Sequence, residues 1–199
     1  MQTTIKYIII TFTILHGLVN TAGAAVIDDF NFDQTAGSSG SPPALLPHGS
    51  LFTERDFIAQ SGEGLISGGI LTANPTTQPH HALVSLEYNT ASGVDFTEGG
   101  LNSSLYFQGD FSSGDHFNVF IDDTSGTVQS FFSEIDILTS SLVMIEFSHF
   151  NFVDFTSITK LRWQYETLNG NSMSMQNITT HAPQQAVPEP SSIVLLGVG

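Results

Sequence analysis

The sequence predicts an all-β fold, a two-sheet antiparallel β-sandwich of the jelly-roll type. Short runs alternate apolar and polar residues with a period of two, turn dipeptides separate them, and no window of similar length shows helical periodicity. The clearest alternation lies at 158–166, where Leu161, Trp163 and Tyr165 share one face, and we expect Trp163 in the core. About ten such strands without βαβ spacing favour two packed sheets.

Four strands are expected in the first half of the chain, and turn-forming residues bound each of them. The Ser, Gly and Pro residues of 38–50 predict a loop after the first strand. Asn74-Pro75 predicts a turn after the third. The expected strands are 26–33, 52–60, 64–72 and 82–89.

Six more strands are expected in the second half. Glycine-containing dipeptides separate them, and Asn169-Gly170 between two alternating runs predicts a hairpin. Residues 152–157 predict an irregular corner or a short turn of helix. The expected strands are 101–108, 116–122, 127–134, 142–148, 158–166 and 172–179.

Composition excludes several classes of function. The 199 residues include 4 Lys and Arg against 19 Asp and Glu, which gives a net charge of −15 and leaves too few cations to bind nucleic acid. The 16 Phe residues are more than a disordered acidic chain would carry. Because the chain has no Cys, disulfides, thiolate metal sites and cysteine nucleophiles are excluded.

The first 24 residues read as a signal peptide. Lys6 precedes an apolar run at 7–19, and Ala22-Gly23-Ala24 has the small-residue pattern of a cleavage site, so we expect cleavage after Ala24. The run is shorter than the ~20 residues a membrane-spanning helix needs. An uncleaved anchor or a buried helix is the alternative. We therefore expect an exported protein whose domain spans 25–180.

The C-terminal residues form a second address signal. A linker at 181–187 leads into Val187-Pro188-Glu189-Pro190-Ser191-Ser192, and an apolar run begins at Ile193. This tail resembles the PEP-CTERM sorting signal of proteins processed by the membrane enzyme exosortase. The resemblance implies export machinery and exosortase as partners and transient membrane association through the tail. Residues 188–199 match only the start of the signal, so we expect its helix and Arg cluster to follow Gly199. A copy of the signal that cannot be sorted is the alternative.

The layout of the domain resembles the galactose-binding-like jelly rolls of exported carbohydrate-associated proteins. The shared features are a first strand opening Ile27-Asp28-Asp29-Phe30 and a final pair of strands at 158–166 and 172–179. The resemblance implies a sugar site on a loop rim or sheet face and a structural calcium ion near the first strand. The last strand carries no acid where many relatives place one.

Two pairs of adjacent acids are the candidate calcium ligands, and no other cofactor is expected. They are Asp28 with Asp29 and Asp122 with Asp123. Neighbours on a strand point to opposite faces, so only one of each pair can serve a given site. Turn caps and a solvated strand edge are the alternative reading.

Tyr106 and Phe120 form a candidate ligand platform, because rings stack on the apolar faces of sugars. Both are out of phase with the apolar residues beside them, which predicts that they face away from the core. Packing beneath a loop is the alternative.

No catalytic signature is present. The chain lacks G-x-S-x-G, P-loop and H-E-x-x-H patterns, and its His residues lack the spacing of metal pairs. A glycosidase needs two carboxyl groups at a defined distance from each other, and five glutamates are the candidates for such a pair. That set is Glu87, Glu98, Glu134, Glu146 and Glu166.

These observations predict an exported, non-catalytic protein of the cell surface or extracellular matrix of a Gram-negative-type bacterium. By resemblance, it would bind or help build the exopolysaccharide of a biofilm. A secreted glycan-acting enzyme and a purely structural matrix protein without a ligand are the alternatives.

Overall fold

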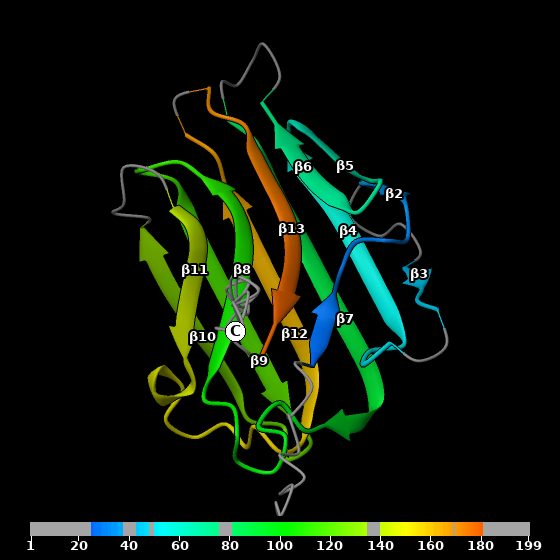
Figure 1. The fold of residues 1–199 in the computed structure, drawn as a ribbon, viewed down its shortest axis with the longest axis vertical. Helices are drawn as coiled ribbons and strands as arrows, with labels where there is room; N and C mark the ends of the chain where they lie inside the picture. The colour runs from blue at the N-terminus through cyan, green and yellow to red at the C-terminus, as the bar shows by residue number, and fades with distance from the viewer. Residues whose placement is uncertain are drawn as a thin grey trace, which may run out of the picture.

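Two antiparallel sheets pack face to face in the computed structural model, which confirms the predicted all-β sandwich (Figure 1). The structure describes residues 25–37, 43–47, 50–75, 81–134, 140–168 and 170–180. The signal peptide with Ala22 and Ala24, the linker at 181–187 and the sorting motif from Val187 to Ser192 lie outside these residues.

Sheet A has the strand order β11-β8-β13-β6-β5-β2, and β1 also pairs with β13. Every pair in the sheet is antiparallel. Its strands are β1 (Val26–Asp28), β2 (Gln34–Thr35), β5 (Glu63–Ser67), β6 (Ile70–Asn74), β8 (Ser104–Phe111), β11 (Ser140–Glu146) and β13 (Met173–Thr179).

Sheet B has the order β10-β9-β12-β7-β4-β3, again antiparallel throughout. Its strands are β3 (Ala44–Leu45), β4 (Glu54–Ser61), β7 (Leu83–Val94), β9 (His116–Asp123), β10 (Val128–Glu134) and β12 (Ile158–Glu166). A 3-10 turn at Phe147–His149 is the one helical element among the described residues, and none of these forms a helix able to cross a membrane.

The core lies between the sheets and is rich in aromatic rings. Trp163 is fully buried, as the sequence predicts, and its ring stacks beside Tyr165 with centroids 5.8 Å apart. Phe107 from sheet A meets Phe117 from sheet B edge-on at 4.8 Å. Alternate residues of each inner strand point inward, so burial of apolar area selects the register of both sheets.

Two predicted strands and one predicted loop differ from the structure, and local backbone geometry interrupts both strands. The expected strand at 26–33 ends at Asp28, since Phe30 adopts a left-handed conformation with φ of 55° and redirects the chain into β2. The expected strand at 64–72 is a hairpin, in which Gly68 and Gly69 take φ of 60° and 80°. The expected loop at 38–50 contains the short strand β3.

Two further strands are shifted along the chain. Residues 101–103 precede β8 rather than opening it, and Leu101 is 66% exposed in the loop. Residues 147–149 leave β11 and form the 3-10 turn. Residues 152–157 form an irregular corner, as the sequence predicts, in which Asp154 accepts hydrogen bonds from Thr156 and Ser157.

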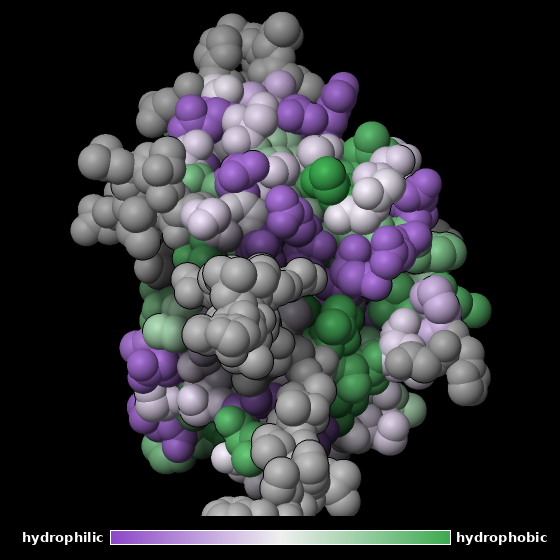
Figure 2. Space-filling model, in the orientation of Figure 1, coloured by the Kyte–Doolittle hydropathy of each residue, from purple (hydrophilic) through white to green (hydrophobic). Residues whose placement is uncertain are grey.

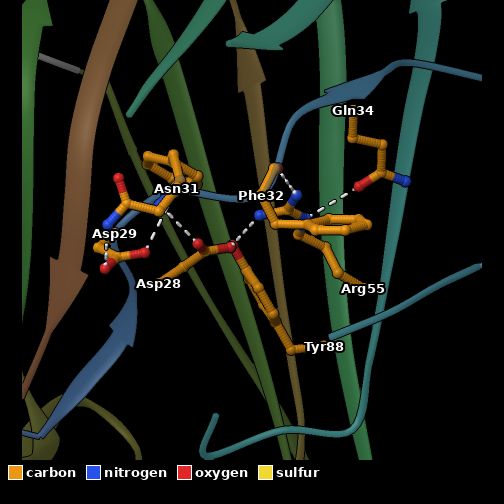
Figure 3. A network of polar contacts seen from close by, with 8 residues as sticks. Asp28, Asp29, Asn31, Phe32, Gln34, Arg55 and Tyr88 are labelled. Atoms are coloured by element: carbon orange, nitrogen blue, oxygen red, sulfur yellow. Dashed lines mark hydrogen bonds and ion pairs between the residues drawn. The ribbon is translucent and has the colours of Figure 1, made fainter. Parts of the chain in front are cut away.

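A buried polar network joins β1 of sheet A to sheet B (Figure 3). The Arg55 guanidinium donates to Asp28 Oδ2 at 2.6 Å and to the Phe32 carbonyl at 2.6 Å, and its Nε donates to Gln34 Oε1 at 2.9 Å. Tyr88 donates its hydroxyl to Asp28 Oδ2 at 2.8 Å. Burial raises the pKa of Tyr88 well above its ordinary value, and the Asp28 carboxylate raises it further.

We expect Asp28→Asn to lower the free energy of unfolding by about 3–5 kcal/mol, because it leaves the buried Arg55 without its counter-charge. Urea unfolding followed by tryptophan fluorescence measures the loss. Asp29→Asn is the matched control, since that exposed carboxylate accepts hydrogen bonds from Asn31 alone. Its expected effect is within about 0.5 kcal/mol. Equal effects at the two positions would contradict this role of Arg55.

Candidate functional site

The two residues of the predicted ligand platform lie on different sheets. Tyr106 is on β8 of sheet A, and Phe120 is on β9 of sheet B. Both are half-buried and alternate with fully buried neighbours, so each ring lies on the outer face of its own sheet. They cannot contribute to one binding platform.

The candidate calcium ligands of the first strand have other partners. Asp28 accepts hydrogen bonds from Arg55 and Tyr88 on Oδ2 and from the Phe30 amide on Oδ1. Asp29 is exposed and caps the turn at Asn31. A guanidinium therefore supplies the positive charge beside Asp28.

Asp122 and Asp123 point to opposite sides of sheet B. Asp123 accepts hydrogen bonds from Ser125 and Thr127 on Oδ1 and from the Asp154 amide on Oδ2, which fixes the turn after β9. Asp122 lies on the outer face beside Lys160. Among the residues that the structure describes, no three His, Asp or Glu side chains are close enough to bind a metal ion.

The five glutamates considered for catalysis are dispersed over the fold. Glu87 and Glu166 lie on the outer face of sheet B, and Glu98 lies in the loop before β8. Glu146 ends β11, where it accepts a hydrogen bond from Ser148. Glu134 is the last residue of β10.

The outer face of sheet B carries one continuous row of side chains across five strands. In register, the row runs Ser130, Phe120, Arg162, Glu87 and Asp56 on β10, β9, β12, β7 and β4. At the usual separation of strands, four intervals extend about 19 Å. We call this the central row.

Arg162 is the unusual member of the central row. Its guanidinium carbon lies 3.9 Å from the centroid of the Phe120 ring, a cation–π contact. Its Nε is buried and has no hydrogen-bond partner. A buried donor without a partner costs about 1–3 kcal/mol, so this Nε is held in place by the packing of Arg162 on Phe120. The residue as a whole is half-buried, so a ligand would meet other atoms of the side chain.

Among the described residues no acid forms an ion pair with Arg162, although its charge acts to lower the pKa of Asp122, which burial raises. Glu87 lies directly opposite in register, yet its Oε1 pairs with Lys160 Nζ at 2.9 Å. Burial, reinforced by Glu87, raises the pKa of Asp56. Burial also raises the pKa of Asp122, against the lowering effect of Lys160. Within the described part of the chain, Arg162 makes no ion pair.

The next row adds hydrogen-bonding groups and a second ring. It contains Phe132, Asn118 and Gln164 on β10, β9 and β12. Phe132 is 59% exposed, and its ring lies 5.4 Å from that of His116, which pairs with Glu166 at 3.1 Å. Aromatic rings, amides and carboxylates thus share one solvent-accessible face.

Arg162 and Asp56 are candidate site residues that we did not identify in the sequence. A signal for Arg162 was present, because the alternation at 158–166 puts Lys160, Arg162 and Gln164 on the outward face. Nothing local predicted its neighbours, since Phe120 and Glu87 reach it only through the pairing of β12 with β9 and β7.

Comparisons with known proteins give distant similarity in fold only. No protein-family model matches the chain, and no curated protein is significantly similar to it. A family 29 carbohydrate-binding module variant complexed with mannohexaose matches with 16% identity over 75% of this chain and 90% of that chain, with a TM-score of 0.37. A family 11 module from Clostridium thermocellum, in complex with a β-1,3-1,4-mixed-linked tetrasaccharide, shares 13% identity over 78% and 94%, with a TM-score of 0.39. An agarase shares 11% identity over 79% of this chain and 26% of its own, with a TM-score of 0.46.

The two aspartates at the end of β9 should respond differently to loss of charge. Hydrogen bonds from the Asp154 amide and from Ser125 lower the pKa of Asp123 to about 2, so its charge stabilises the fold above pH 4 and the benefit is lost as the pH falls through 2. We expect Asp123→Asn to lower the Tm at pH 7 and the difference from wild type to shrink at pH 2. Asp122→Asn, the control, should leave the Tm at pH 7 unchanged or higher, because burial raises that pKa. Calorimetry across this pH range checks both, and a constant difference for Asp123→Asn would refute the assignment.

Proposed function

We propose that the protein is an exported, non-catalytic glycan-binding module whose binding surface is the outer face of sheet B. The observation that carries the proposal is Arg162, a guanidinium stacked on Phe120 with a buried Nε that lacks an acceptor. The rest of this half-buried guanidinium would donate hydrogen bonds to hydroxyl and ring oxygens of a sugar.

The chemistry of the face suits a hydroxyl-rich chain. Phe120 and Phe132 offer apolar ring surface, and Asn118 and Gln164 can each donate and accept hydrogen bonds. The Glu87 and Asp56 carboxylates in the central row can accept hydrogen bonds from sugar hydroxyls. A row about 19 Å long would contact several consecutive sugar units rather than one.

The charge of the face favours a neutral glycan. Lys160 is already paired with Glu87, so Arg162 is the one unpaired cation among several acids of the described face. Removal of the signal peptide would also take away Lys6 and no acid, making the chain still more negative. A polyanionic chain would be repelled at long range.

A glycan-acting enzyme is a second candidate, supported by one observation. Asp56 and Glu87 are directly opposite each other on neighbouring strands, and burial raises the pKa of Asp56, as a general acid requires. Hydrolysis of mannohexaose or a mixed-linked glucan that is abolished by Asp56→Asn would favour this reading over binding alone.

The expected address signals would direct this module out of the cell. The signal peptide would deliver the chain across the membrane, and the tail from Val187 to Ser192 would present it to exosortase. At the cell surface or in the extracellular matrix, weak binding by many copies would associate the protein with exopolysaccharide.

We expect Phe120→Ala and Arg162→Ala each to weaken glycan binding at the outer face of sheet B at least tenfold, because each removes one half of the stacked pair. Neutral oligosaccharides on a glycan array, with mannohexaose and the mixed-linked tetrasaccharide as soluble probes in calorimetry, measure the change. Phe152→Ala is the control, since that ring is 78% exposed in the turn after the 3-10 element, away from the central row. Unchanged binding in both site variants would refute this surface.

Export can be tested independently of binding. In a bacterium that has an exosortase, we expect the secreted product to begin at Ala25 and the Glu189→Ala variant of a complete gene to stay in the membrane fraction. N-terminal sequencing and fractionation provide the measurement. Cytoplasmic protein that retains Met1 would contradict the proposal.

A further inference from the structure

We propose that the outer face of sheet A is a second glycan-binding surface, so that one domain bridges two polysaccharide chains. The proposal rests on the proposed function, because it assigns the same class of ligand to the opposite side of the sandwich. It starts from the position of Tyr106, which the fold separates from Phe120.

Tyr106 lies in an apolar strip at one side of sheet A. Met144 on β11 is its direct cross-strand neighbour and is 52% exposed. Leu142, two residues along the same strand, is 36% exposed. The Tyr106 ring, flanked by the apolar side chains of Met144 and Leu142, offers an apolar surface on which a pyranose can stack.

A band of amide and hydroxyl groups lies next to this strip. Asn177 on β13 donates to Gln108 Oε1 at 3.0 Å, and Asn177 Oδ1 is buried without a hydrogen-bond partner. Further along the same pair of strands, β13 and β8, the Ser174 hydroxyl donates to Asp110 Oδ2 at 3.0 Å. Figure 2, which looks onto this face, shows hydrophilic side chains gathered over β13 and its neighbouring strands in the upper half of the view. The exposed Asp110 carboxylate and the half-buried side chains of Gln108 and Asn177 can hydrogen-bond sugar hydroxyls.

Charge identifies the occupant as a neutral, hydroxyl-bearing chain. Among the described residues, Arg55 is buried and Lys160 and Arg162 lie on sheet B, so the outer face of sheet A has no cation. Asp110 on this face would repel a phosphate, sulfate or uronate group. A neutral sugar would meet no such repulsion, and it could contact the uncharged amides and the Tyr106 ring.

The two surfaces cannot hold the same stretch of one chain. They face away from each other across two sheets whose backbones pack about 10 Å apart. Two polysaccharide chains would therefore run on opposite sides of one domain. Such a two-sided module would cross-link a matrix as well as coat it.

The test counts ligands and measures cross-linking with the same protein. Calorimetry with mannohexaose and with the mixed-linked tetrasaccharide should give two sites for the wild type, one for Tyr106→Ala, one for Arg162→Ala and none for the double variant. Turbidity of soluble mannan or mixed-linked β-glucan should rise with the wild type. It should fall at least tenfold with either single variant, although each still binds oligosaccharide.

Folding and specificity have separate controls. Tyr106→Phe keeps the ring and should retain both sites, Phe152→Ala should match the wild type, and unchanged Tm values show that the variants fold. One site in the wild type that Tyr106→Ala leaves intact would overturn the second surface and leave the proposed function standing. Loss of binding in Tyr106→Ala alone would instead refute the sheet B surface. A dimer that Tyr106→Ala dissociates, without any sugar bound on sheet A, would show a second copy as the occupant and overturn the proposal.

Discussion

The buried ion pair between Arg55 and Asp28 determines how the N-terminal strand is held in this sandwich. Strand β1 pairs with sheet A, but its carboxylate reaches across to a guanidinium and a Tyr88 hydroxyl from sheet B. Taking two charges out of water is costly unless every polar atom finds a partner. The carbonyl of Phe32 and the amide of Gln34 supply the remaining acceptors, so the segment after β1 is fixed as well.

The described part of the chain has only three Lys and Arg residues, and each lies in a different environment. Arg55 is used in the interior, Lys160 is paired with Glu87, and Arg162 is held against Phe120 without an ion pair. The chain has 19 acids and 4 Lys and Arg, so a described guanidinium without an ion pair stands out. The chemical difference between the two outer faces follows from this distribution, since the two half-buried cations of the described chain, Lys160 and Arg162, both lie on sheet B.

Much of the fold could be predicted from the chain, because a period of two in hydrophobicity defines a half-buried strand directly. Trp163 and its alternating neighbours were assigned correctly to the core. The misplaced boundaries lie where backbone conformation overrides pattern, at Phe30 and at the Gly68-Gly69 turn. Composition alone does not reveal the left-handed conformation of Phe30. The Phe30 amide donates to the Asp28 carboxylate, and Arg55, which is distant in sequence, holds that carboxylate in place.

The sequence by itself determined the all-β class, the inward and outward faces of its clearly alternating strands, such as 158–166, and the strong negative charge, because these depend on neighbours along the chain. Only the tertiary structure decided which outward residues meet. Tyr106 and Phe120 look equivalent in sequence, yet the strand order places them on opposite sides of the molecule. Arg162 and Phe120 are 42 positions apart but adjacent in the sheet. Strand pairing joins distant segments through backbone hydrogen bonds, and a local pattern carries no record of which strands pair.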